Sequence, residues 1–179
     1  RQVHPPARDT SAEDQRFCES LRGEIASLRV ARSSWISERQ DKIYDRQKWH
    51  ETMMHNYEVL KRQEEKLRDY EIELADLEGS PYNLPDPNRR RRRFEPGPIQ
   101  DIVNHGRKNQ LREKIKELRS LIERIRRTIG KSADVIHALS ERIAYIEGKL
   151  REVEIQLIEP ERQHEIRCGR LDPPMGKWR

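Results

Sequence analysis

Apolar and aromatic side chains are scarce in this chain of 179 residues. Hydrophobic residues make up 33% of it and aromatic residues 6%, whereas charged residues make up 39%. A compact domain is usually about 45–50% apolar, because burial must offset an ordering entropy of about 1–2 kcal/mol per residue. The composition therefore argues against a globular core, although enough apolar residues remain to line a narrow seam between helices.

Cysteines and long apolar runs are scarce as well. Cys18 and Cys168 are far apart and make no disulfide framework, so we expect two free, reduced thiols, with a bridge between them as the less favoured alternative. No apolar run approaches the ~18–20 residues of a membrane span, and the polar first residues carry no secretory signal. We therefore expect an intracellular, reducing location in the nucleus or the cytoplasm, including the cytoskeleton, with an organelle left open, and no membrane partner.

The sequence also lacks the residue patterns of known catalytic sites, such as G-x-S-x-G, H-E-x-x-H and C-x-x-C. Gly130-Lys131-Ser132 looks like the end of a phosphate-binding loop, but the required earlier glycine and strand are missing. His164 and Cys168 have no further zinc ligands nearby, which predicts a surface histidine beside a free thiol. We predict no enzyme, no cofactor, no metal site and no small-molecule substrate.

Proline and glycine divide the chain into helices and connecting segments. Thr10 and Glu13 fit a capping box, and Gly79 followed by Pro81 is typical of a helix end. Pro160 is expected to end a second helix near Ile158. The predicted all-α chain has a polar lead (1–10), a first long helix (11–78), a Pro- and Arg-rich basic connector (79–107), a second long helix (108–159), and a short helix with an extended tail (160–179).

The second helix carries an apolar pattern that alternates steps of four and three residues over fourteen positions. This heptad pattern predicts a coiled-coil seam. The only polar member of the series is Ser132. The predicted seam residues are Leu111, Ile115, Leu118, Ile122, Ile125, Ile129, Ile136, Leu139, Ile143, Ile146, Leu150, Val153 and Leu157.

The first helix has a less regular apolar stripe, with large side chains where the spacing slips. We expect it to pack against the second helix, with a heterologous partner on its aromatic part as the alternative. Three apolar residues of the tail have no local core to enter. The predicted partner-docking residues are Trp35, Trp49, Met53, Tyr57, Leu171, Met175 and Trp178.

Charge favours an antiparallel hairpin of the two helices. Residues 58–78 hold four basic and eight acidic side chains, whereas residues 107–131 hold ten basic and three acidic ones. If the connector folds the chain back, these oppositely charged stretches lie side by side. Two copies of the same stretch would instead repel each other. The alternative is that each helix pairs with another subunit, identical or different.

The connector contains the run Arg89, Arg90, Arg91, Arg92 and Arg93, followed by Phe94. Arginine offers planar, bidentate donors that match phosphates and carboxylates. The chain as a whole carries a formal net charge of +5, which favours acidic partners. The run is therefore expected to contact RNA or DNA or an acidic protein lattice such as microtubules, with an import signal or a solvated loop as further alternatives.

These features predict a non-enzymatic coiled-coil scaffold subunit of a large assembly, whose basic loop contacts an acidic surface. Nucleic acid is the leading partner, as in a ribonucleoprotein or chromatin component, together with other helical subunits, identical or different. One alternative is a cytoskeletal or ciliary microtubule-associated protein. Another is an adaptor or regulator that recruits partners through its tail. The residues match no family that we recognise.

Overall fold

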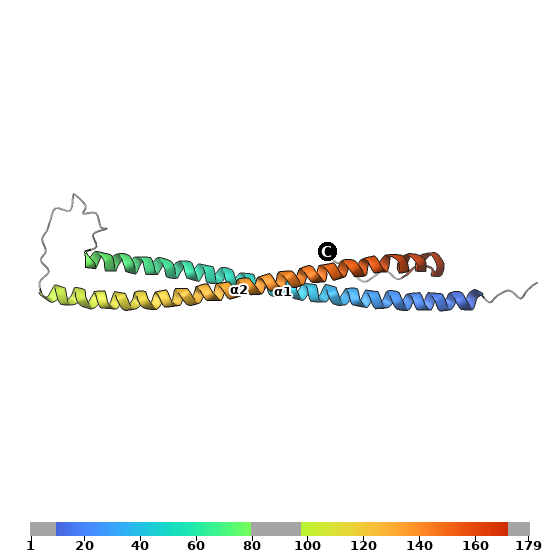
Figure 1. The fold of residues 1–179 in the computed structure, drawn as a ribbon, viewed down its shortest axis with the longest axis horizontal. Helices are drawn as coiled ribbons and strands as arrows, with labels where there is room; N and C mark the ends of the chain where they lie inside the picture. The colour runs from blue at the N-terminus through green and yellow to red at the C-terminus, as the bar shows by residue number, and fades with distance from the viewer. Residues whose placement is uncertain (1–9, 80–97, 172–179) are drawn as a thin grey trace, which may run out of the picture. The chain divides into compact units, whose positions relative to one another are not determined.

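The computed structural model describes residues 10–79 and 98–171 of the chain. They form two long helices, α1 (Thr10–Glu78) and α2 (Pro98–Cys168) (Figure 1). Within these two described ranges there is no strand. The predicted all-α class with two long helices is therefore confirmed. In the described part of the chain, neither helix has a segment both long and apolar enough to cross a bilayer.

The bounds of α1 follow from local chemistry. The helix begins at Thr10, and Glu13 places a carboxylate in its first turn, where the helix dipole favours negative charge. It ends at Glu78 because Gly79 adopts the left-handed conformation with φ of 66°, which costs glycine no steric penalty. The Gly79 amide donates to the Asp76 carbonyl oxygen at 3.4 Å, so the end of the helix is capped as the sequence predicts.

The bounds of α2 differ from the prediction at both ends. The helix begins at Pro98 rather than near residue 108. Proline suits a first helical position, since its fixed φ is helical and its missing N–H needs no partner there. The predicted end near Ile158 is also wrong, because α2 continues through Pro160 to Cys168 and closes at Gly169, with φ of 91°. Pro160 is buried, and this packing offsets the backbone hydrogen bond that a proline removes.

The described residues form two units. Unit 1 combines residues 10–47 of α1 with residues 136–171, and unit 2 combines residues 48–79 with residues 98–135. In unit 1 the helices run antiparallel, since Arg29 pairs with Glu161 and Arg39 with Glu147. Its apolar core cluster is Leu21, Ile25, Val153 and Leu157, with Phe17, Leu28, Trp35 and Leu171 packed against it.

Unit 2 is likewise an antiparallel helical pair. Glu64 pairs with Arg126 and Glu71 with Arg119, so positions rise along α1 as they fall along α2. Five aliphatic residues of α2 are buried between the two segments: Leu111, Ile115, Leu118, Ile122 and Ile129. Each such aliphatic side chain contributes about 1.5–3 kcal/mol when it leaves water, so this row is the main stabilising feature of the unit.

Candidate functional site

The α2 seam predicted from the sequence is the most deeply buried part of both units. Ten of its thirteen apolar residues are buried, and so is Ser132, which is 1% exposed. The Ser132 hydroxyl donates to the Thr128 carbonyl oxygen at 3.0 Å, so its polar atom is satisfied within the helix. The remaining three seam residues, Ile125, Ile136 and Leu139, are half-buried.

The α1 side of the seam is regular, although its apolar residues alone suggest slips. Steps of four and three residues continue without a break, and every member except Trp49 is buried or half-buried. In unit 1 the series is Leu21, Ile25, Leu28, Arg32, Trp35, Arg39, Lys42 and Arg46. In unit 2 it is Trp49, Met53, Asn56, Leu60, Gln63, Leu67, Tyr70, Leu74 and Leu77. Polar residues therefore occupy some of the seam positions, and apolar spacing alone does not reveal them.

Trp35, predicted to dock a partner, is used inside unit 1. Its ring meets the edge of Tyr145 with centroids 6.1 Å apart. The guanidinium of Arg142 lies 5.8 Å from the Trp35 ring and 5.0 Å from the Tyr145 ring, and it is held by Glu38 at 2.6 Å. This cation–aromatic cluster joins α1 to α2.

The other predicted docking residues are divided between internal packing and exposure. Leu171 packs against the core cluster of unit 1, so it is not an isolated anchor. In unit 2, Met53 is half-buried, while Trp49 and Tyr57 are 41% and 47% exposed. Met175 and Trp178 lie outside the described residues. Arg89, Arg90, Arg91, Arg92, Arg93 and Phe94 also lie outside them.

The two cysteines are not free thiols, which corrects the prediction. Cys18 and Cys168 form a disulfide with Cα atoms 5.8 Å apart, a separation typical of such bonds. No local pattern in the sequence indicates this pairing, because 150 residues separate the two cysteines. The antiparallel arrangement of unit 1 brings them together, since Cys18 lies early in α1 and Cys168 is the last residue of α2.

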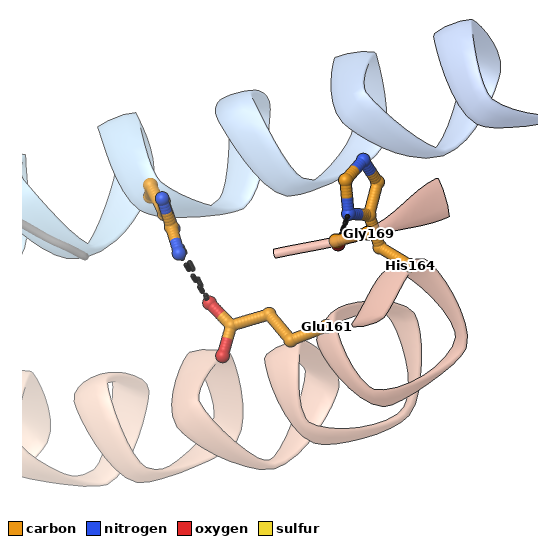
Figure 2. Close-up of polar contacts among 4 residues, drawn as sticks. Glu161, His164 and Gly169 are labelled. Atoms are coloured by element: carbon orange, nitrogen blue, oxygen red, sulfur yellow. Dashed lines mark hydrogen bonds and ion pairs between the residues drawn. The ribbon is translucent and has the colours of Figure 1, made fainter. Parts of the chain in front are cut away.

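His164 is not a surface residue either, because it is 2% exposed. Its Nδ1 lies 3.0 Å from the Gly169 carbonyl oxygen, and its Nε2 lies 3.2 Å from Arg22 Nε (Figure 2 shows the Gly169 contact). A carbonyl can only accept and a guanidinium can only donate, so the proton belongs on Nδ1 and the ring is neutral. His164 thereby holds the turn after α2 and receives a hydrogen bond from α1.

Further polar contacts surround this end of unit 1. Glu161, one turn before His164 in Figure 2, accepts from Arg29 at 3.1 Å. Arg167 pairs with Asp14 at 3.3 Å, and its guanidinium lies 3.9 Å from the centroid of Phe17. We call the disulfide, the His164 contacts and the Arg167 contacts the terminal clasp. Together they join the first turns of α1 to the last turns of α2.

Opposite charges meet across unit 2, as the hairpin prediction requires. Arg107 donates to both carboxylate oxygens of Glu73, at 2.7 and 2.9 Å. These hydrogen bonds lower the pKa of Glu73 below its ordinary value of 4.5 and raise the pKa of Arg107. Arg112 pairs with Glu78, the last residue of α1, at 2.7 Å. Such exposed pairs select orientation more than they stabilise.

No cluster in the described ranges 10–79 and 98–171 brings together three His, Cys, Asp or Glu side chains that could hold a metal ion. Each unit is a pair of helices with an apolar seam between them. Comparison with protein-family models, with curated proteins and with solved structures finds no match for this chain.

Proposed function

We propose that this protein is a non-enzymatic structural subunit in which a coiled-coil hairpin presents the basic segment Arg89–Arg93 to an acidic partner. The leading partner is a nucleic acid, as in a ribonucleoprotein or chromatin component. The paired helices serve as the scaffold, and the arginines supply the contacts to phosphate.

The observation that carries this proposal is the pairing of Arg112 with Glu78 at 2.7 Å. It places the end of α1 beside a residue about four turns after the start of α2 within unit 2. The segment that holds the five arginines leaves α1 at Gly79 and rejoins the chain at Pro98, where α2 begins. Gly79 and Pro98, which flank the basic segment in the chain, therefore both belong to unit 2.

The charge of α2 supports a phosphate-bearing partner. Residues 107–131 carry ten basic and three acidic side chains. Only part of this excess is neutralised across unit 2, and Lys116, Arg124 and Lys131 are exposed with no carboxylate within ion-pair distance in the described residues. These cations extend a positive surface along α2, and neutralised phosphates release counterions from nucleic acid.

The test is the salt dependence of binding to a labelled 20-base-pair DNA duplex and to a single-stranded RNA of equal length. Replacing Arg89–Arg93 by Gln is expected to weaken binding. It should also flatten the plot of log affinity against log salt by roughly 0.7–0.9 for each phosphate that the variant no longer neutralises. The matched control removes the same charge at five exposed arginines that form no ion pair with residues 10–79 or 98–171. It replaces by Gln the residues Arg16, Arg62, Arg68, Arg151 and Arg170.

Equal losses of affinity in the two variants would mean that net charge alone attracts nucleic acid, and this would refute the role of the arginine run. Co-sedimentation with microtubules that depends on Arg89–Arg93, without nucleic-acid binding, would instead assign the run to an acidic protein lattice. That result would replace the leading partner with the cytoskeletal alternative.

A further inference from the structure

The α1 seam of unit 1 contains a row of cations. Four half-buried cations occupy seam positions in a row that only Trp35 interrupts. They are Arg32, Arg39, Lys42 and Arg46. Seam positions of paired helices normally hold apolar side chains, because they face the partner helix. This row therefore departs from the apolar pattern, and it is the only run of cations in the seam of the described residues.

The α2 residues that face this row are aliphatic. The Arg39–Glu147 and Arg46–Ser140 contacts place Leu139, Ile143, Ile146 and Leu150 opposite it. Placing a cation against an aliphatic surface removes part of its hydration without supplying a counter-charge, which is unfavourable. Two helices that only needed to bind each other would be more stable here with leucine or isoleucine.

The described residues supply little compensation for these cations. Arg39 pairs with Glu147 at 2.9 Å, and Arg46 Nη1 donates to the Ser140 hydroxyl oxygen at 3.3 Å. Arg32 and Lys42 have no carboxylate within ion-pair distance in residues 10–79 and 98–171. Three of the four cations therefore have no negative partner in this part of the chain.

The aliphatic row is incompletely covered at the same place. Ile143, Ile146 and Leu150 are buried, but Ile136 and Leu139 are only half-buried. Arg46 contacts Ser140, the neighbour of Leu139 in the chain, so the half-buried Leu139 lies next to a cation that has no carboxylate partner in the described residues. We call Lys42, Arg46, Ile136 and Leu139 the mixed surface of unit 1.

We infer that the mixed surface binds an acidic amphipathic helix of a partner protein. Apolar side chains of such a helix, spaced three and four residues apart, would cover Ile136 and Leu139. Its carboxylates would neutralise Lys42 and Arg46. A nucleic acid would neutralise the cations but leave Ile136 and Leu139 only half-buried, so the combination favours a helix. This binding uses none of the residues of the basic segment, so it is independent of the proposed function.

The first test measures stability and binding in one variant. Replacing Lys42 and Arg46 by Leu completes an apolar seam in the hairpin. It is expected to raise the melting temperature, because the two cations stabilise binding of the partner helix and not the packing of α1 against α2. The probe is a fluorescent 21-residue helix with Leu at seam spacing and Glu elsewhere, whose binding is followed by anisotropy. The variant is expected to bind it at least about tenfold more weakly, a loss of about 1.4 kcal/mol.

A lowered melting temperature for Lys42→Leu/Arg46→Leu would overturn the inference, since the cations would then stabilise the hairpin itself. The second test uses a milder double variant, Lys42→Gln/Arg46→Gln. Its control, Arg16→Gln/Arg151→Gln, loses the same charge elsewhere on the chain. Arg16 and Arg151 are exposed and have no ion pair in the described residues. Equal loss of probe binding in the two variants would also count against a localised site.

Other occupants give distinct outcomes. A probe with Lys in place of Glu is expected not to bind, and equal binding by it would refute the charge argument. Oligonucleotide binding that is lost in Lys42→Gln/Arg46→Gln, with no binding of the acidic helix, would assign the surface to nucleic acid instead. A dimer in analytical ultracentrifugation that dissociates in the same variant would assign it to a second copy of this chain, and either result overturns the inference.

Discussion

Cys18 of α1 and Cys168 of α2 are joined by a disulfide that spans 150 residues of sequence. The bond ties an early turn of α1 to the last residue of α2, next to the buried ring of His164. The bond agrees with the antiparallel direction that the Arg29–Glu161 and Arg39–Glu147 pairs establish in unit 1. It also shows that one end of unit 1 is held by more than apolar packing.

Removing the disulfide is expected to destabilise the chain. The chain-entropy model gives about 5 kcal/mol for so long a loop, and losing a native disulfide usually costs about 2–5 kcal/mol. Thermal unfolding of Cys18→Ser/Cys168→Ser should show a lower melting temperature than the native chain without reductant. Dithiothreitol should lower the native melting temperature to that of the variant and leave the variant unchanged. A native chain that melts alike with and without dithiothreitol would show that the bond adds no stability.

Replacing His164 by Ala is expected to cost about 1–3 kcal/mol, because the Gly169 carbonyl and the Arg22 guanidinium each lose a buried partner. His164→Gln should recover part of the loss, since an amide can both donate and accept. The control is His137→Ala, whose side chain is 76% exposed and which should change stability by less than about 0.5 kcal/mol. Urea unfolding measures all three. Equal effects of the two alanine variants would contradict the role given to His164 in the terminal clasp.

Leu150→Ala should destabilise unit 1 by about 2–5 kcal/mol, because Leu150 is fully buried in the seam and its loss leaves a cavity. Ile155 lies on the same stretch of α2 but is 68% exposed, so Ile155→Ala should change the free energy of unfolding by less than about 0.5 kcal/mol. Chemical denaturation followed by circular dichroism compares the two. If Ile155→Ala were the more damaging change, the assignment of the seam face would be wrong.

The Glu73–Arg107 pair predicts a pH dependence. The pKa of Glu73 is lowered in the folded state, first by the hydrogen bonds from Arg107, so the carboxylate adds stability above pH 4.5. That contribution is lost as the pH falls through the lowered folded-state pKa. Glu73→Gln should therefore reduce the melting temperature at pH 7, and its difference from the native chain should shrink below pH 4.5.

Two controls accompany the Glu73 measurement. Glu113 is exposed with no ion pair in the described residues, so Glu113→Gln should show a smaller pH-dependent difference. The charge swap Glu73→Arg/Arg107→Glu should restore much of the stability lost in Glu73→Gln. A Glu73→Gln difference that stays constant from pH 7 to pH 3 would show that the pairing contributes nothing to folding.

The sequence predicted the parts of the fold that depend on local rules. The alternating apolar steps of α2 identified a helix with one buried face, and Gly79 marked the end of α1. The charge difference between residues 58–78 and 107–131 predicted the pairs that Arg107 and Arg112 make in unit 2. Spacing and charge are both properties of short stretches, so they can be recognised without knowing the tertiary structure.

Features that depend on long-range packing could not be predicted in this way. Pro160 would end an isolated helix, but burial against α1 keeps it within α2. The partners of Cys18 and His164 are far away in sequence, so no local pattern links them. Apolar spacing is the usual signal of a seam and does not identify the cations of the α1 seam. Only the burial of both helices shows that Lys42 and Arg46 continue it.

Mapping the cysteines is the decisive measurement of whether the chain folds back on itself so that α1 and α2 pair antiparallel. The chain is purified without reductant, its monomer is isolated, and its peptides are analysed by mass spectrometry before and after reduction. We expect the Cys18 peptide to be covalently linked to the Cys168 peptide within one chain, and reduction to separate them. Free cysteines in the folded monomer, or links found only between two copies, would contradict the antiparallel hairpin.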